Sequence, residues 1–259
     1  MIIILTQCFP PKIGGIESLI ENLSIELSKT HEVLVLADQY DKKNDSDYDT
    51  KYDQNISISR ISGIKFFRKR KKLSELKKLL SSNKISHVIA DSWKSFELTI
   101  DTLKSLSIPS ICLAHGNELI VKNSSKKLRV ISTLNKVTHI VTNSNFTLSL
   151  VKDIGITNQK ITCIYPGAQN TIHLNEEIIS NINGQPVITT LARLEKRKGH
   201  AYILSVIAKL KAEHPNILYI IAGSGIEFEN LKKITLELDI IKNVIFLGDI
   251  NENQKKYLF

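Results

Sequence analysis

Short apolar runs alternate along this chain with segments in which apolar residues recur every three or four positions. Residues 2–5 (IIIL) predict a buried strand, and the spacing of Ile16, Ile20, Leu23 and Leu27 predicts an amphipathic helix. The alternation continues through further predicted strands: HEVLVLAD, ISISRIS, SHVIADS, PSICLA, THIVT and KITCIY. We expect a polar loop around KKNDSDYDTKYDQN and one helix over FELTIDTLKSLS. This rhythm predicts a mostly parallel sheet with helices on both faces.

The pattern breaks between residues 168 and 186, where polar, Asn- and Glu-rich sequence predicts a linker. Afterwards the rhythm resumes with three predicted strands: PVITTLARL, NILYIIAGSG and NVIFLGDI. We therefore predict two α/β lobes, residues 1–170 and residues 185–259. The second lobe has about three strands, few for a doubly wound domain, and is expected to be incomplete. A fragment and a natural truncation are the two explanations that the sequence leaves open.

Composition describes a folded protein, with 42% hydrophobic and 24% charged residues among 259. No apolar run approaches the roughly 18 residues needed to cross a bilayer, and the N-terminus lacks the features of a signal peptide. We therefore expect a cytoplasmic protein. The three cysteines are widely spaced, which favours reduced thiols over disulfides. Neither the cysteines nor the seven histidines show metal-ligand spacing, so no metal site is expected.

The positive charge is concentrated in one segment. Residues 65–84 (KFFRKRKKLSELKKLLSSNK) hold nine Lys or Arg and one Glu, which accounts for nearly all of the net charge of +9. Apolar residues form one stripe of this predicted helix: Leu73, Leu76 and Leu80. A crossover helix with a solvated lysine face is one interpretation. The other is a membrane surface, with Phe66 and Phe67 entering the headgroups and the cations meeting anionic lipid. Nucleic acid is disfavoured, because no aromatic residue lies among the cations.

Unusual polar clusters follow the predicted strands: Gly14-Gly15, His115-Gly116-Asn117-Glu118, Asn143-Ser144, Arg193 to Lys198, and Gly223-Ser224-Gly225. In open α/β sheets, ligands bind beyond the carboxyl ends of the strands. Two glycines at a helix start leave backbone N–H groups open to an anion. An arginine fork and a lysine charge can neutralise a diphosphate. Together these clusters predict a ligand cleft between two domains, although each also fits an ordinary turn.

The order GGIE, HGNE, NSNFT, YPG, ARLEKRKG and AGSG resembles that of family 4 glycosyltransferases over essentially the whole chain. ARLEKRKGH and its spacing to IIAGSG are the strongest signals, followed by HGNE. The resemblance implies a GT-B fold of two Rossmann-like lobes, the second incomplete here. It also implies sugar transfer from a nucleotide-sugar donor with retention, with the acceptor on the N-terminal lobe and the donor on the C-terminal one. A lipid-linked or cell-envelope glycan acceptor at the inner membrane leaflet is expected, and no cofactor besides the donor substrate.

The same resemblance implies roles for individual residues. His115 would lie near the transferred sugar, and Arg193 and Lys198 would hold the diphosphate without a metal ion. Further substrate-binding residues are implied: Gly14, Gly15, Glu17, Asn117, Glu118, Ser144, Gly223 and Gly225. The chain ends before the family's E-x7-E segment, and YPGAQ stands where an asparagine often follows the proline. An inactive remnant that serves as a binding module and a nucleotide-sugar epimerase of the same fold are the alternatives.

Overall fold

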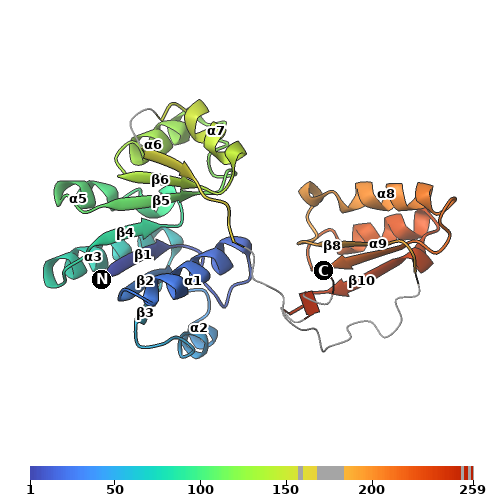
Figure 1. The fold of residues 1–259 in the computed structure, drawn as a ribbon, viewed down its shortest axis with the longest axis horizontal. Coiled ribbons are helices and arrows are strands. Elements are labelled where there is room, and N and C mark those ends of the chain that lie inside the picture. Colours follow the sequence, from blue (N-terminus) through green and yellow to red (C-terminus); the bar gives the residue numbers. More distant parts are fainter. Residues whose placement is uncertain (157–159, 168–183, 252–253, 256–257, 259) are drawn as a thin grey trace. The chain divides into compact units, whose positions relative to one another are not determined.

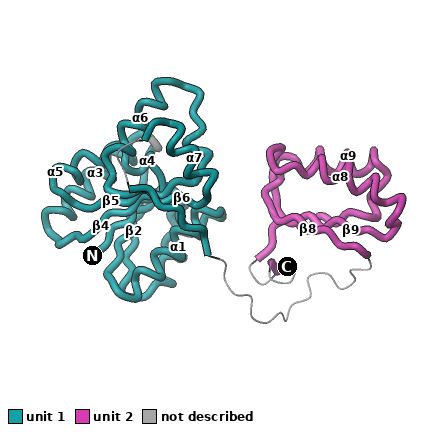
Figure 2. Tube along the Cα trace, turned by 45° about the horizontal axis from the view of Figure 1, so that its top comes forward, with its two compact units in different colours: residues 1–167 teal, residues 168–259 magenta. Residues whose placement is uncertain are grey.

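The computed structural model describes residues 1–156, 160–167, 184–251, 254–255 and 258. It divides into two compact units, Met1–Gly167 and Ala168–Phe259, and each unit has its own sheet (Figures 1 and 2). Most of the predicted linker, between the predicted lobes 1–170 and 185–259, lies outside the described residues. The α/β fold with parallel sheets that the sequence predicts is confirmed.

Seven parallel strands form the sheet in the described part of unit 1, in the order β3-β2-β1-β4-β5-β6-β7. Their bounds are β1 (Ile2–Thr6), β2 (Val33–Asp38), β3 (Ile56–Ile61), β4 (His87–Ala90), β5 (Ser110–Ala114), β6 (His139–Thr142) and β7 (Lys160–Cys163). The strand order reverses at β1, which pairs with β2 on one side and β4 on the other. Such a reversal opens a crevice at the carboxyl ends of the strands.

Helices cover the two faces of this sheet unequally (Figure 1). Their bounds are α1 (Gly15–Ser28), α2 (Lys42–Asp49), α3 (Lys65–Ser82), α4 (Trp93–Phe96), α5 (Ile100–Ser105), α6 (Ser124–Leu134) and α7 (Asn145–Asp153). Side chains alternate between the faces of a strand, so Ile2 and Ile4 of β1 pack with Ile20 of α1. Ile3 and Leu5 belong instead to a larger cluster that includes residues of α3 to α7.

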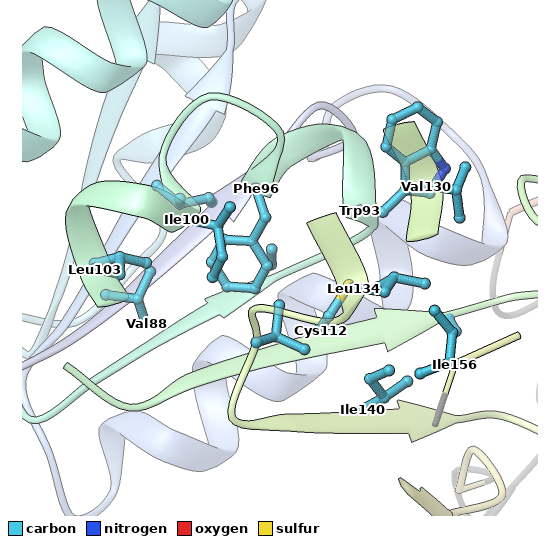
Figure 3. Packing of buried hydrophobic residues seen from close by; sticks show 14 of the residues in the cluster. Val88, Trp93, Phe96, Ile100, Leu103, Cys112, Val130, Leu134, Ile140 and Ile156 are labelled. Carbon is cyan, nitrogen blue, oxygen red and sulfur yellow. The ribbon is translucent and has the colours of Figure 1, made fainter. Parts of the chain in front are cut away.

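The larger cluster is the main core of unit 1 (Figure 3). Trp93 and Phe96 from α4 and Ile100 from α5 pack in it with Cys112 of β5 and Ile140 of β6. Burial, together with the charges of Asp91 and Glu118, raises the pKa of the Cys112 thiol well above its ordinary value. All three cysteines are free, as their spacing predicts.

Two local predictions differ from the structure. The segment expected to be a polar loop contains α2, because Asp41 caps its first backbone N–H groups and Tyr48 donates a 2.7 Å hydrogen bond to Glu21 of α1. The single helix expected after β4 is divided into α4 and α5. Between them, the hydroxyl of Thr99 donates to the carbonyls of Ser95 and Phe96, a local bond that competes with regular helix geometry.

Three cations of the basic helix α3 pair with carboxylates of unit 1, whereas one interpretation of the sequence had them on a solvated face. Lys72 is only 4% exposed, and its ammonium contacts the Thr6 carbonyl and the Asp38 carboxylate, the latter at 2.5 Å. Arg68 pairs with Asp38 at 3.1 Å, and Lys69 pairs at 2.5 Å with Glu97, which follows α4. These three cations neutralise carboxylates of unit 1 and do not face water freely. No helix in the described part of the chain has the length and apolarity needed to cross a bilayer.

A parallel sheet in the order β10-β9-β8 forms the described part of unit 2. Its elements are β8 (Val187–Leu191), η1 (Lys196–Lys198), α8 (His200–Leu210), β9 (Leu218–Ala222), α9 (Phe228–Glu237), η2 (Ile241–Asn243) and β10 (Val244–Gly248). The central strand β9 is buried along its whole length. Tyr219 and Ile221 of β9 pack with Leu204 and Ile207 of α8 and with Leu231 of α9.

We expect Leu76→Ala to lower the free energy of unfolding of unit 1 by about 2–5 kcal/mol, because a fully buried leucine leaves a cavity when truncated. Leu73→Ala, one turn earlier on α3 and only half-buried, should cost clearly less. Trp93 is the single tryptophan, so urea unfolding followed by its fluorescence reports on unit 1. Equal costs for the two variants would contradict the inward placement of Leu76.

Candidate functional site

The candidate residues lie at the carboxyl ends of strands in each unit. His115 directly follows β5, Asn143 follows β6, Arg193 comes two residues after β8, and Gly223 follows β9. Because all strands are parallel, these ends share one edge of each sheet. The structure thus gathers the unit 1 candidates at one edge and the unit 2 candidates at another.

His115 is half-buried and is held by two hydrogen bonds. Its ring Nε2 lies 2.8 Å from the backbone carbonyl of Asp91. A carbonyl oxygen only accepts, so Nε2 carries the hydrogen, and in the neutral ring Nδ1 is left as an acceptor. The backbone N–H of His115 donates to Glu118 Oε1 at 2.7 Å. The ring is therefore oriented before any substrate binds.

The other two site residues predicted from HGNE, Asn117 and Glu118, differ in exposure. Glu118 closes the turn through its bond to His115 and is half-buried, so it supports the loop. Asn117 is exposed and remains accessible to a ligand. Gly116 has a φ of +108°, which favours glycine, and a Cβ there would lie 3.3 Å from Thr147 Oγ1.

Asp91 is a central residue of this edge that lies outside the sequence motifs. It directly follows β4 and is 2% exposed. Its carboxylate accepts hydrogen bonds from Thr6 Oγ1 and the Gln7 N–H, both at 2.8 Å. It also accepts from Ser92 Oγ at 3.1 Å and Ser95 Oγ at 2.6 Å. Its place directly after the apolar run VIA is the signal that the sequence offers, while its partners Thr6 and His115 are distant in sequence.

The helix start at Gly14 and Gly15 already holds a carboxylate. Gly14 caps α1, and the buried Glu17 side chain folds back so closely that a Cβ at Gly14 would lie 2.2 Å from its Oε2. Lys12 pairs with Glu17 at 3.2 Å. Burial opposes the charge of Lys12, but the bond to Glu17 outweighs this and raises its pKa. A hydroxyl donor suits this place better than a second anion such as a phosphate.

Cys8 lies beside these carboxylates. Burial, followed by the charges of Asp91 and Glu17, raises the pKa of its thiol to about 11. The thiol is therefore protonated at neutral pH and is a poor nucleophile. Within the described residues, no group of three or more His, Cys, Asp or Glu side chains is arranged to hold a metal ion.

Ser144 has a structural partner in this fold. Its hydroxyl accepts the backbone N–H of Thr147 at 3.1 Å and so caps α7. Thr147 Oγ1 donates in turn to Asn143 Oδ1 at 2.8 Å. The predicted substrate-binding role of Ser144 therefore competes with helix capping.

An apolar groove of about 370 Å³ adjoins His115 and Asn143. Its wall on α1 consists of Leu19, Leu23 and Leu27, and its floor on the strands includes Ile89, Ile111, Leu113 and Val141. Polar side chains are contributed by His115, Asn143 and Tyr165. The walls suit an apolar group and do not suit a charged diphosphate.

In unit 2, two glycines hold the backbone that carries Arg193. Gly223 has a φ of +132°, and a Cβ there would lie 2.2 Å from the carbonyl oxygen of Ala192. Gly225 has a φ of +157°, with its Cβ position 2.4 Å from the carbonyl oxygen of Leu194. The N–H of Leu194 donates to the Ser224 carbonyl at 2.8 Å. These glycines are therefore needed for close approach of two backbones, which places Arg193.

The cations of this loop are open to solvent. The Arg193 side chain is 69% exposed and lies 3.3 Å from Glu195, which also pairs with Arg197 at 2.6 Å. Lys198 is exposed and lies in η1, one residue before the cap of α8 at Gly199. An anion can thus reach a guanidinium and an ammonium at the start of one helix.

His200 follows these cations but belongs to the core of unit 2. It is buried, and its ring nitrogens lie 3.4 Å from the Tyr219 hydroxyl and from the Arg193 carbonyl. Burial raises the pKa of Tyr219, whose hydroxyl also donates to Thr190. The buried His200 ring thus contacts the Arg193 backbone from the core of unit 2.

The two units match models of known families. Residues 13–169 match the model described as Glycosyltransferase Family 4, and residues 174–259 match that of Glycosyl transferases group 1. The chain belongs to Glycosyltransferase Family 4. This agrees with the resemblance carried by its motifs.

Relatives of this glycosyltransferase are distant. It is 23% identical to a GDP-mannose-dependent alpha-(1-6)-phosphatidylinositol monomannoside mannosyltransferase of Mycolicibacterium smegmatis, over 96% of this chain and 67% of the relative. It is similar in structure to Anabaena HepE in complex with UDP, at 16% identity and a TM-score of 0.76 over 99% and 71% of the two chains. Sucrose-phosphate synthase of Thermosynechococcus elongatus gives 13% identity and a TM-score of 0.80 over 99% and 72%.

We expect Gly225→Ala to lower the free energy of unfolding of unit 2 by about 1–3 kcal/mol, because the new Cβ meets the Leu194 carbonyl in a strained backbone conformation. Gly248→Ala is the matched control. Gly248 also has a positive φ, of +69°, but its Cβ would meet open space. Chemical denaturation monitored by circular dichroism compares the two. If Gly248→Ala costs as much as Gly225→Ala, the close backbone contact contributes nothing.

Proposed function

We propose that this glycosyltransferase moves a hexosyl group from a nucleotide-sugar donor to a lipid-linked or cell-envelope glycan acceptor, with retention. The observation that carries the proposal is the pair of exposed cations, Arg193 and Lys198, on a backbone held by Gly223 and Gly225. The names of its relatives support such a donor, because one is GDP-mannose-dependent and another is a UDP complex. One relative's name gives a guanosine nucleotide and the other a uridine nucleotide, so we propose a nucleotide-sugar donor without naming its base.

Arg193 and Lys198 stabilise the departing diphosphate. As the bond between the anomeric carbon and the phosphate oxygen breaks, negative charge grows on the leaving group, and preorganised cations offset it. Glu195 holds one side of the Arg193 guanidinium, so its remaining N–H groups can bind a phosphate oxygen. The proposal requires no metal ion, since these cations neutralise the charge.

Unit 1 supplies the groups that orient the sugar and the acceptor. His115 positions the transferred sugar, with Nδ1 accepting from a hydroxyl while Nε2 is held by the Asp91 carbonyl. His115 is a positioning group here and not a nucleophile. Glu17 at the helix start accepts a hydrogen bond from an acceptor hydroxyl, and Gly15 leaves open space for its approach. The exposed Asn117 is a further contact.

Arg193→Ala and Lys198→Ala are each expected to lose about 2–4 kcal/mol of transition-state stabilisation, which is roughly a 30- to 1,000-fold loss in kcat/KM. Lys196→Ala is the matched control, because Lys196 is an exposed lysine in the same short helix. Release of nucleoside diphosphate from a panel of nucleotide sugars measures turnover. Unchanged turnover in both test variants would refute the assignment, and no turnover by the parent chain with any donor would refute the proposed function.

The start of α3 supports a membrane-bound acceptor. Phe66 and Phe67 are 65% and 50% exposed, and Ile64 before them is also exposed. Arg70 and Lys71 are exposed beside them, with the Arg70 guanidinium 4.9 Å from the centre of the Phe66 ring. Exposed aromatic and apolar side chains next to cations suit the headgroup region of an anionic bilayer. We propose peripheral binding to the cytoplasmic leaflet through these residues.

Three of the cations of α3 are held in ion pairs and are not free to contact lipid. Arg68, Lys69 and Lys72 pair with Asp38 or Glu97 and hold α3 on the unit. Replacing all cations from Lys69 to Lys72 would therefore damage the fold as well as any lipid contact. Arg70 and Lys71 form no ion pair within the described residues, and Lys71 Nζ donates only to the Ser62 carbonyl, at 3.1 Å, so glutamine can remove their charge while keeping a donor at position 71.

Arg70→Gln/Lys71→Gln is expected to weaken binding to anionic vesicles by about 2 kcal/mol, roughly 30-fold, because each cation near such a surface contributes about 1 kcal/mol. Lys122→Gln/Lys127→Gln removes the same charge from exposed positions elsewhere in unit 1 and should bind like the parent. Co-sedimentation with phosphatidylglycerol vesicles and with phosphatidylcholine vesicles measures binding, which should fade as salt rises. Full binding by the Arg70/Lys71 variant would show that the membrane role is wrong.

A further inference from the structure

We infer that Asp91 is the positioning residue for His115, and that it holds the imidazole in the Nε2–H form with Nδ1 as the acceptor. The inference rests on the proposed function, in which His115 orients the transferred sugar. Asp91 does not contact the ring through its carboxylate. It acts through its own backbone carbonyl, 2.8 Å from Nε2.

The Asp91 carboxylate holds that carbonyl in place. One oxygen accepts from the Thr6 hydroxyl and the Gln7 N–H at the end of β1. The other accepts from the hydroxyls of Ser92 and Ser95, at the cap and in the first turn of α4. Four hydrogen-bonding groups thus converge on one side chain that is 2% exposed. The end of β1 and the start of α4 are thereby tied to the residue whose carbonyl meets His115.

A carboxylate fits this position. The Gln7 N–H can only donate, and the hydroxyls of Ser92 and Ser95 donate to Asp91, so an ionised carboxylate, which only accepts, satisfies all three. The Thr6 hydroxyl has one hydrogen, which it shares between Asp91 and the Cys8 carbonyl, both at 2.8 Å. An asparagine would force the hydroxyls that face its NH2 group to turn and accept, which changes this network. The cost of burying the charge is offset by these charge-assisted hydrogen bonds. The side chain is therefore specified by its neighbours, and the position of its carbonyl follows from it.

His115 is fixed at two points as a result. Glu118 holds its backbone N–H, and Asp91 holds its ring. Nδ1 makes no hydrogen bond to another group in the described part of the chain, so its lone pair is available to a substrate hydroxyl. In the other tautomer Nδ1 would donate, and the ring would no longer accept from such a hydroxyl.

A residue that merely stabilises the fold would not change the tautomer of one histidine, so the test measures the tautomer directly. Two-bond 1H–15N correlation spectra of the full chain report which ring nitrogen is protonated. His115→Gln identifies the His115 signals among the seven histidines. We expect the parent chain to show the Nε2–H form and Asp91→Asn to populate the Nδ1–H form. The same variant should lower kcat for sugar transfer by roughly 10- to 100-fold, with little effect on the KM of the donor.

Asp45→Asn is the matched control. Asp45 is as buried as Asp91 and accepts backbone N–H groups of Tyr40 and Asp41, but it does not contact His115. This variant should leave the His115 tautomer unchanged. If Asp91→Asn does not fold, Ser95→Ala removes the shortest of the four hydrogen bonds to the Asp91 carboxylate and should shift the tautomer in the same direction by less.

Three outcomes decide the inference. A folded Asp91→Asn or Ser95→Ala chain with the parent tautomer and the parent kcat would overturn it. A shift of the His115 tautomer in Asp45→Asn would also overturn it, because the effect would then be one of general stability. A tautomer shift confined to Asp91 and Ser95 variants supports positioning even if the parent chain transfers no sugar, and that result would overturn the proposed function alone.

Discussion

Parallel pairing of every strand is the constraint on which this molecule depends. Each strand must be followed by a crossover, so the carboxyl ends of all strands in a sheet lie at one edge. Residues far apart in the chain, such as Thr6, Asp91 and His115, meet at that edge for this reason alone. Sheets of this kind place chemistry in the loops after the strands, while the strands themselves supply the apolar core.

Two poorly exposed carboxylates, Asp38 and Asp91, lie at the strand ends of unit 1. Asp38 is neutralised by Arg68 and Lys72 of α3, and the Asp91 carboxylate is contacted by four hydrogen-bonding groups. A buried charge without partners would cost several kcal/mol, so these groups must be placed together with their partners. They rigidify the loops that present the candidate residues. The basic helix α3 thus has two parts: inward cations that hold the fold, and an outward end with exposed aromatic side chains.

In unit 2, close backbone contacts take the place of buried charge in holding the candidate loop rigid. Gly223 and Gly225 let one loop press against the backbone of residues 192–194, and His200 supports the same backbone from the core. Arg193 and Lys198 then project into solvent from a rigid base. Preorganisation of this sort is what a phosphate site requires, because flexible cations would have to be ordered at the expense of binding energy.

Local pattern was sufficient for the strands and for the positions of the glycine-rich loops, His115 and Arg193 after them, because apolar periodicity and strand ends are properties of neighbouring residues. Helix α2 was not predicted: its cap at Asp41 is local, but Glu21, which anchors Tyr48, lies 27 residues away. Nor did local pattern predict the inward cations of α3 or the role of Asp91, since their partners, Asp38, Thr6 and His115, are distant in sequence. Sequence determined which residues stand at the strand ends. Only the tertiary structure decided which of them are paired with one another and which are left open to a substrate, because pairing depends on distances that the order of residues does not contain.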